Sequence, residues 1–535
     1  MKFISRGLNA LPLSVWLVVA STAAAAESPN YEPTEFMRER PALPESLAHP
    51  APRQLSVREA VQLAVQNNLS VELVRQELAI SRQGIPLAKG RFEPTVTALF
   101  RHTDSASPPS TLQEGMSGQV LDTQVNDLSL GYRQQLSLGT ILGFDFSNSR
   151  SESNVGSAVG PLLYSTSLNL RLVQPLLRGF GFDLDVPYAD VLRAELSSEG
   201  ARQAVVGVVM STVRQAELEY WDLVFALKSH QVQQKSLELA RQQVSLTQRQ
   251  IEAGIRPPSD LINAEGTLAQ RELRLVQAEN TILGVSDQLR HLLNMPRAEW
   301  AVPILPVDAP QLRVVSVTLE DAYARALSNR PELAQGRVAV KRAALDTRVG
   351  ENERLPRLDA ELTYGLIGQD PSYGGAIDQL SSGDARTYGA GLSLSWEPLN
   401  RAASAQLETF RITERAERTA LEQRELDLQL ELRGALRALE TALRSVSAAA
   451  KVRQLAERSL DAEQRKFETG DGTSSSFFIA ERQDALAQAQ LDELSALIQH
   501  EKARTALSAA MGVLLEERGI ELGVRGPRAA KSSLR

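Results

Sequence analysis

The chain has no cysteine among its 535 residues. It can therefore form no disulfide, and it offers neither thiolate metal ligands nor a cysteine nucleophile. Its five histidines are scattered without the H-x-x-x-H spacing of zinc sites. The sequence also lacks a G-x-S-x-G motif and a Gly-rich phosphate loop after a strand. We expect a protein without catalytic residues, metal or cofactor, and hence not an enzyme.

The sequence also has no excess of basic over acidic residues. The formal net charge is -7 at pH 7, whereas proteins that bind nucleic acid usually present a positive face to its phosphates. We therefore expect no nucleic acid partner.

The first 26 residues have the pattern of a secretory signal peptide. Lys2 and Arg6 form a basic start, residues 11–20 an apolar core, and the three alanines at 24–26 a cleavage site. The apolar run is too short to span a membrane, which disfavours a membrane anchor. We expect cleavage before Glu27 and export from the cytoplasm.

Both flanks of the mature chain are predicted to lie outside the main fold. Residues 27–54 form an N-terminal extension with six prolines, which interrupt regular helices and favour an extended strap or linker. Residues 514–535 end in a basic stretch without apolar periodicity. We predict that this second segment is a disordered tail.

The remaining sequence contains an internal duplication. LSVREAVQLAVQNN returns as VTLEDAYARALSNR. Each copy begins with a helix-start signal, a Ser or Thr followed three residues later by Glu or Asp. RQIEAG, ending at Gly254, likewise returns as RKFETG, ending at Gly470. We therefore divide the chain into a first structural repeat, 55–316, and a second, 317–513.

Each repeat contains one very long helical stretch, at 187–253 and 402–468. Both run for about 67 residues, or roughly 100 Å at 1.5 Å per residue. Apolar or small residues recur at alternating spacings of four and three, which indicates coiled-coil packing. The apolar seam is interrupted by His230 and Gln234 in the first repeat and by Arg453 in the second. An ordinary antiparallel coiled coil would show the same periodicity.

A second kind of segment alternates apolar and polar residues. In the segment nearest the second long helix, Leu392 and Leu394 point one way while Ser393 and Ser395 point the other. This pattern matches transmembrane strands with a lipid face and a polar lumen, although a soluble β-domain remains an alternative. The segments are 95–102, 128–134, 142–148 and 167–173 in the first repeat, and 359–366 and 389–396 in the second. We expect loops at 104–118, 149–160 and 369–385.

Four to six strands per chain cannot close a membrane barrel, because open edges would leave backbone groups unpaired in lipid. The chain must therefore pool its strands with copies of itself. Three chains with four strands each would give twelve strands, and three with six would give eighteen. The segment 128–148 decides between these numbers, because it contains the additional hairpin. Either closure predicts a pore on the symmetry axis.

The sequence resembles the TolC-like outer membrane efflux proteins (outer membrane factors). The resemblance covers residues 55–513, and it is carried by an ordered set of short motifs together with the duplicated helix starts. These motifs are VQPLL (173–177), WEPLN (396–400), YWDL (220–223) and the paired R-x-x-E-x-G turns. The resemblance implies a mainly α fold with transmembrane β: a TolC-like α-helical barrel plus a trimeric outer-membrane β-barrel, internally duplicated.

The same resemblance implies a location and partners. The homotrimer would sit in outer-membrane lipid with a long periplasmic portion. Each long helix would be flanked by two shorter helices stacked end to end. The channel would act as the passive conduit of a tripartite efflux or type I secretion system. It would contact a periplasmic membrane-fusion adaptor and an inner-membrane pump of the resistance-nodulation-division or ABC type.

In this family the two hairpin turns form the periplasmic tip, which contacts the adaptor and opens like an iris. The corresponding residues here are Arg249, Gly254, Ile255, Arg256, Arg465, Gly470 and Gly472. The best-known member narrows its tip with two aspartates, and Ser476 and Ile479 occupy those places in this chain. The candidate constriction residues are therefore Asp260, Asp471, Ser476, Phe477 and Phe478.

These candidates favour different kinds of gate. A ring of phenylalanines would gate by dewetting, while a ring of aspartates would favour cations. Simpler roles exist for both: Phe477 and Phe478 could pack between helices, and Asp260 could compensate the positive end of a helix. The competing hypothesis for the whole chain is a periplasmic coiled-coil scaffold with a small β-domain.

Overall fold

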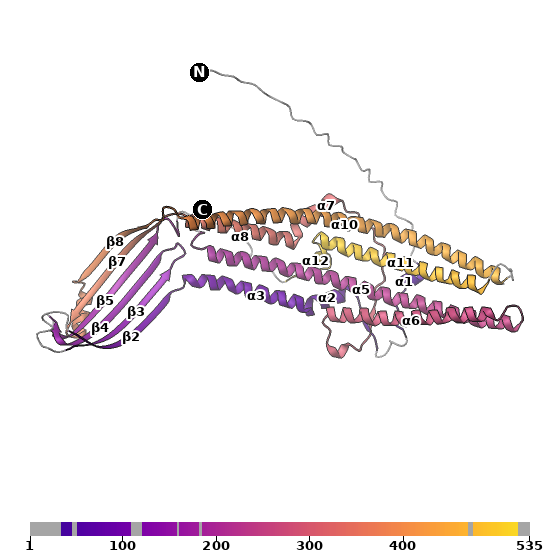
Figure 1. The fold of residues 1–535 in the computed structure, drawn as a ribbon, viewed down its shortest axis with the longest axis horizontal. Helices are drawn as coiled ribbons and strands as arrows, with labels where there is room; N and C mark the ends of the chain where they lie inside the picture. Colours follow the sequence, from indigo (N-terminus) through magenta and orange to yellow (C-terminus); the bar gives the residue numbers. More distant parts are fainter. Residues whose placement is uncertain are drawn as a thin grey trace, which may run out of the picture.

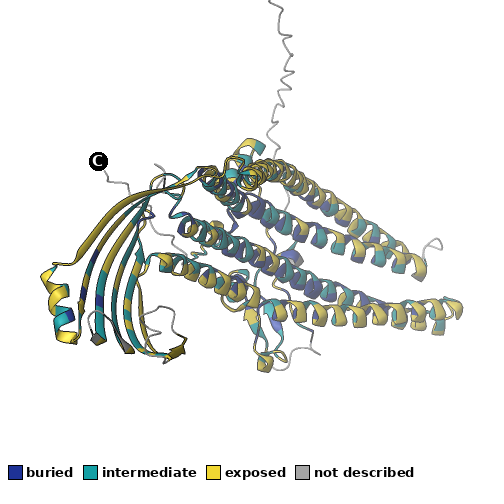
Figure 2. Ribbon diagram, turned by 60° about the vertical axis from the view of Figure 1, so that its left-hand side comes forward, coloured by how far each residue is buried: buried dark blue, intermediate teal, exposed yellow. Residues whose placement is uncertain are grey.

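The computed structural model describes residues 34–44, 51–108, 120–157, 160–180, 185–468 and 475–522. The predicted signal peptide and its cleavage site lie outside these ranges. The molecule is elongated, with a curved six-stranded sheet at one end and a bundle of long helices running away from it (Figure 1). Fully buried residues are concentrated in the helical part (Figure 2).

Two long helices form the axis of the bundle. α5 (Ala189–Glu252) has 64 residues and α10 (Arg401–Glu468) has 68, as the periodicity predicts. Two shorter helices lie along each of them: α3 (Leu69–Lys89) and α6 (Ser259–Leu292) along α5, and α8 (Pro331–Glu353) and α11 (Ser476–Ala510) along α10. None of the described helices has a stretch apolar enough to cross a membrane.

The duplication is visible in two short helices that precede the shorter bundle helices. α2 (Val57–Asn67) begins with a complete capping box between Ser56 and Glu59. α7 (Leu319–Asn329) begins at Thr318, whose hydroxyl accepts a hydrogen bond from the backbone N–H of Asp321. The two helix starts predicted from the repeated sequence are therefore present.

The sheet is an antiparallel meander in the order β2-β3-β4-β5-β7-β8. Among the described residues this sheet has six strands per chain rather than four, and each includes nearly all of its predicted segment. The strands are β2 (Thr95–Ser107), β3 (Leu121–Gln135), β4 (Ile141–Ser157), β5 (Gly160–Pro175), β7 (Arg357–Asp370) and β8 (Arg386–Ser395).

The pairing register of the strands places apolar side chains on one face of the sheet and mostly polar or small ones on the other. One row of paired residues crosses all six strands with apolar side chains only: Val96, Tyr132, Phe144, Leu170, Tyr364 and Tyr388. The adjacent row, on the opposite face, is Thr97, Gly131, Asp145, Asn169, Gly365 and Thr387. Many apolar side chains of the first face are exposed in the single chain, which is the pattern of a lipid-facing surface.

Two predicted loops are wrong in part. β4 continues to Ser157 through the segment expected to be a loop from residue 149. This stretch is polar on both faces, so it carries no alternation although its backbone pairs with neighbouring strands. The expected loop 104–118 likewise begins with four residues of β2, and its residues 109–118 lie outside the described ranges.

The expected loop 369–385 contains helix α9 (Tyr373–Ser382). α9 lies against β7 so closely that a Cβ on Gly368 would be 2.0 Å from the carbonyl oxygen of Ala376. The ring of Tyr373 also packs edge-on against Tyr164 of β5, with centroids 6.0 Å apart. Only a glycine in the strand allows this contact, and the helix is too short to give a periodic signal.

The middle of the molecule is tied together around Tyr220, the first residue of the YWDL motif. β1 (Arg53–Leu55) pairs in parallel with β6 (Ile304–Pro306). The fully buried hydroxyl of Tyr220 lies 3.0 Å from the carbonyl oxygen of Leu55 and 2.8 Å from a carboxylate oxygen of Asp308. The motif thus joins the long helix α5 to the start of the first repeat and to the segment that follows β6 near the end of that repeat.

Both predicted flanking segments are partly structured. Within the proline-rich extension, α1 (Glu35–Arg38) forms one turn and Met37 is buried in the main core. The prediction that residues 514–535 form a disordered tail is wrong for residues 514–522, since α12 (Leu514–Glu517) packs into the same core. Arg518 also forms an ion pair with the buried carboxylate of Glu217. A basic residue that completes a buried ion pair has no distinguishing sequence pattern.

Burial of Lys228 on α5 gives a first prediction. Its side chain has 0% exposure, and burial lowers the pKa of its ammonium group from 10.5 to about 8. The unfolded chain therefore binds more protons between pH 8 and 10.5, so wild-type stability should rise with pH in this window. Lys228→Met removes the buried charge and should therefore stabilise the fold at pH 7, by at most roughly 3 kcal/mol.

Thermal unfolding followed by circular dichroism at pH 7 and pH 9.5 checks this expectation. The variant should unfold at a higher temperature at pH 7 and should lose the increase between the two pH values. Lys235→Met, on the exposed side of the same helix, is the matched control and should change neither. Equal unfolding temperatures for all three proteins would contradict the prediction.

Candidate functional site

The end of the bundle opposite the sheet contains the predicted tip. The α5–α6 turn, the last residues of α10 and the first of α11 all lie at this end (Figure 1). Of the predicted tip residues, Gly470, Asp471 and Gly472 lie outside the described ranges. The others can be placed.

Gly254 ends α5 with a left-handed backbone, at φ +73°. The N–H of Gly254 donates to the carbonyl of Ile251 at 2.9 Å, and the N–H of Ile255 donates to that of Gln250 at 2.9 Å. These two bonds form a Schellman motif, which satisfies the last carbonyl groups of the helix. The side chain of Ile255 is 71% exposed. The turn thus presents an apolar residue to the surroundings on a hydrogen-bonded backbone.

Arg256 joins this turn to the second long helix. Its guanidinium carbon lies 4.6 Å from the ring centroid of Phe467 on α10, a cation–π contact. A guanidinium nitrogen is 3.4 Å from a carboxylate oxygen of Asp260 in the first turn of α6. The predicted residues Arg256 and Asp260 therefore contact one another. Arg249 and Arg465 instead bond one turn back on their own helices, to Ser245 and Asp461.

The two adjacent phenylalanines of α11 are exposed, whereas the next residue is buried. Phe477 and Phe478 pack edge to face with centroids 5.9 Å apart, and they are 64% and 42% exposed. Ile479, by contrast, is buried with Phe467 and Leu460 in a small core at this end. Ser476 is the first residue of α11. Within the single chain, the phenylalanine pair is therefore available for contacts outside the protomer.

Sequence reasoning missed an ion pair that joins the two helical hairpins. Arg271 of α6 is 2% exposed, and its guanidinium group pairs with the carboxylate of Asp484 on α11. Arg274 pairs with the same carboxylate at 2.9 Å. α6 and α11 belong to different repeats, so no periodicity within either helix indicates the pairing. The only indication of this ion pair in the sequence was a basic residue, Arg271, at a seam position of α6.

Two of the three residues that interrupt the coiled-coil seam lie beside a carboxylate within their own hairpins. Arg453 of α10 is buried and lies 2.7 Å from the fully buried carboxylate of Glu493 on α11. His230 of α5 lies 3.7 Å from Glu279 on α6, and burial lowers the pKa of its imidazole. These polar contacts fix the register of each hairpin, a recognised use of buried polar groups in coiled coils.

The outermost strands of the sheet form the second candidate site. β2 and β8 each pair with one neighbouring strand in the described chain, and every residue of both strands is exposed. The apolar rows nevertheless continue across them to the edge. An apolar sheet face with open edges is unstable in lipid, so these edges need partner strands. Among the described residues, no group of His, Asp and Glu could hold a metal ion.

Comparisons with known proteins were made for the sequence and for the fold. The family model of outer membrane efflux proteins matches residues 142–295 and 322–513. The comparison with curated proteins gave no match. The fold is similar to that of the CmeC outer membrane channel of Campylobacter jejuni, with a TM-score of 0.63, 13% identity and 86% coverage of each chain.

Two further solved structures have the same architecture. The outer-membrane channel OprN has a TM-score of 0.63 and 16% identity, with coverage of 91% of this chain and 98% of that one. The outer membrane protein VceC of Vibrio cholerae has a TM-score of 0.62 and 14% identity, with coverage of 85% and 96%. At these identities the structural similarity establishes the fold.

Proposed function

The chain belongs to the outer membrane efflux protein family, and from this premise we propose that three copies of it form a passive export conduit. The protein is an outer-membrane channel subunit with a long periplasmic portion. Beyond this, we propose how many subunits assemble, how they join, which partners bind the tip, and that the channel catalyses no reaction. The open-edged, two-faced sheet is the observation that carries it.

The sheet edges support a closed ring of identical chains. β2 and β8 run in opposite directions, so β8 of one subunit can pair antiparallel with β2 of the next. Three copies of the six-stranded sheet make eighteen strands. Barrel diameter grows roughly in proportion to strand number, so this barrel is about 1.5 times as wide as one of twelve strands.

The tip supports docking of a periplasmic adaptor. The α5–α6 hairpin projects the Gly254 turn and the exposed side chain of Ile255 away from the sheet. An adaptor would bridge this surface to an inner-membrane pump, which supplies the energy that a passive channel lacks. Efflux by a resistance-nodulation-division pump and type I secretion by an ABC pump both use such an arrangement.

The mass and shape of the protein test this proposal first. Outer membranes are extracted in mild detergent, and the particle is studied by light scattering and electron microscopy. The expected result is a threefold tube of roughly 100 Å or more, from helices of this length, with a detergent belt around the sheet end. A rod that washes off with salt and carries no belt would instead support the periplasmic scaffold.

Substitution of Gly254 tests the adaptor surface. A valine at φ +73° is strained, although the space around its Cβ is open. Gly254→Val should therefore distort the turn and reduce both export and adaptor cross-linking by roughly tenfold or more, the equivalent of about 1.4 kcal/mol of lost binding. Gly266→Val, on α6 and also in open space, is the matched control. Normal export and cross-linking in Gly254→Val would refute the tip assignment.

A further inference from the structure

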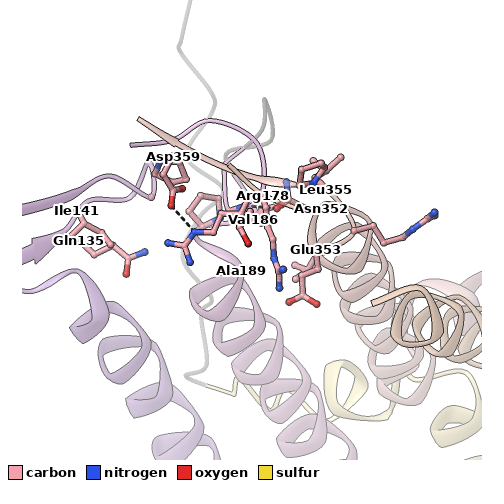
Figure 3. A pocket seen from close by; sticks show the side chains of 18 of the residues that line it. Gln135, Ile141, Arg178, Val186, Ala189, Asn352, Glu353, Leu355 and Asp359 are labelled. Atoms are coloured by element: carbon pink, nitrogen blue, oxygen red, sulfur yellow. Dashed lines mark hydrogen bonds and ion pairs between the residues drawn. The ribbon is translucent and has the colours of Figure 1, made fainter. Parts of the chain in front are cut away.

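A hollow of about 740 Å³ lies where the sheet meets the helical bundle. Figure 3 shows Gln135, Ile141 and Asp359 of the strands on one side of Arg178, and Ala189 and Glu353 of the helix ends on another. Strands β3, β4, β5, β7 and β8 contribute to its lining, together with the first turn of α5 and the last turn of α8. The hollow is therefore enclosed by segments from both repeats.

The strand residues that line the hollow all belong to the polar face of the sheet. They are Arg133, Gln135, Ile141, Val173, Pro175, Arg357, Asp359 and Ser395, and in the register they alternate with the apolar, lipid-facing residues. In a closed barrel this face surrounds the lumen. The hollow thus opens toward the channel and away from lipid. Most of the strand lining comes from the interior strands β3, β4, β5 and β7, and only Ser395 belongs to the edge strand β8.

Arginine dominates the charged lining. Six arginines face four carboxylates, and three of the arginines are engaged in ion pairs. Arg91 and Arg193 pair with Asp190, at 2.9 Å and 2.8 Å, and Arg357 pairs with Asp359 at 2.7 Å. The other three, Arg133, Arg178 and Arg354, form no ion pair with any described residue.

Backbone hydrogen bonds bring two of these unpaired arginines to one place. The N–H of Arg178 donates to the carbonyl of Pro356 at 3.3 Å, which sets it beside the segment that carries Arg354. The adjacent N–H of Gly179 donates to the side-chain oxygen of Asn352 at 2.7 Å. The backbones of Arg178 and Arg354, from different repeats, thus lie close together at the end of the sheet next to the helical bundle, and both residues line the hollow.

We propose that this hollow binds the carboxylate or phosphate group of an anionic solute passing through the channel. The inference rests on the proposed function, because it needs the polar face of the sheet to surround a lumen. Guanidinium groups bind such anions through paired, charge-assisted hydrogen bonds. Three subunits would repeat the site around the axis, so the channel would concentrate anions at the base of its barrel.

Citrate, a small tricarboxylate, is a suitable probe for the purified trimer in detergent. Isothermal titration calorimetry should detect citrate binding that weakens as salt is added. Arg178→Gln combined with Arg354→Gln should weaken binding by roughly tenfold or more, because two charge-assisted contacts are lost. Arg101→Gln is the matched control, since Arg101 lies on the same polar face of β2 but outside the hollow. It should change the affinity by less than about twofold.

Each outcome decides between the hypotheses. Retention of citrate affinity in the double variant would overturn the site, as would an equal loss in Arg101→Gln, which would indicate general attraction by the lumen. Absence of citrate binding by an intact, membrane-inserting trimer would overturn this inference and leave the channel assignment in place. Failure to form a trimer or to insert into a bilayer would instead contradict the proposed function itself.

Discussion

A variant with one cysteine in β2 and one in β8 is expected to form a covalent trimer when outer membranes are oxidised. The chain contains no cysteine, so every cross-link must come from the introduced pair. Each subunit would supply one thiol from its β2 edge and one from its β8 edge, which links three chains into a ring. A disulfide requires Cβ atoms within about 3.5–4.5 Å, so it reports direct pairing of the two strands.

The position of the β8 cysteine must be scanned, because barrel closure staggers neighbouring strands by an amount set by the shear. Thr97→Cys in β2 is therefore combined in turn with cysteine at Thr387, Gly389, Gly391 and Ser393, all on the same polar face. One position, or two neighbouring ones, should give the trimer band on a denaturing gel. Thr97→Cys with Leu392→Cys places the thiols on opposite faces and should give none.

Cross-linked species other than a trimer would change the conclusion. A product that stops at the dimer would show that the ring does not close through these edges. Equal cross-linking of the opposite-face control would indicate random collision rather than strand pairing. Absence of any product across the whole scan would contradict pairing of β2 with β8, and with it the eighteen-stranded barrel.

The second large effect is expected from Asp484→Ala, which should raise single-channel conductance by roughly tenfold. The substitution removes the carboxylate that pairs with the buried Arg271 and with Arg274. An uncompensated buried guanidinium is strongly unfavourable, and here it can regain water only if α6 and α11 separate. A bias of about 1.4 kcal/mol toward the separated state changes its population tenfold. Planar-bilayer recording measures this change directly.

Two controls distinguish a released tip from general damage. Glu272→Ala removes the exposed partner of Arg241 within one hairpin and should leave conductance unchanged. Arg271→Met combined with Asp484→Met replaces the pair by apolar side chains and should return conductance toward the wild-type value. If Asp484→Ala conducts like the wild-type channel, the ion pair does not restrict the tip.

Much of this architecture could be predicted from periodicity. The long helices α5 and α10 follow from apolar spacings of four and three, and the candidate strand segments follow from alternation, because each pattern reflects burial of a face by its own segment. The duplicated helix starts could be predicted for the same reason, since a cap such as Ser56 and Glu59 is completed within four residues. Local patterns identify elements whose stabilising partners are nearby in the chain.

Features without a local pattern could not be predicted. The polar second half of β4 (149–157), the short helix α9 and the packing of Arg518 against Glu217 have no periodic signal. The Arg271–Asp484 ion pair joins helices from different repeats, and the hollow beside Arg178 is assembled from strands and helix ends of both. The sequence predicted that the candidate tip residues lie near the hairpin turns, but it could not indicate which of them contact one another.

The sequence by itself therefore determined the elements, their duplication, the two faces of the sheet and the resemblance to a family of channels. Each of these depends on side chains a few residues apart, whose chemistry fixes how a segment buries one face. Only the tertiary structure decided the strand number, the link between the hairpins and the arginine-lined hollow. These depend on residues such as Arg271 and Asp484, far apart in the chain, that meet only after the helices and strands have packed.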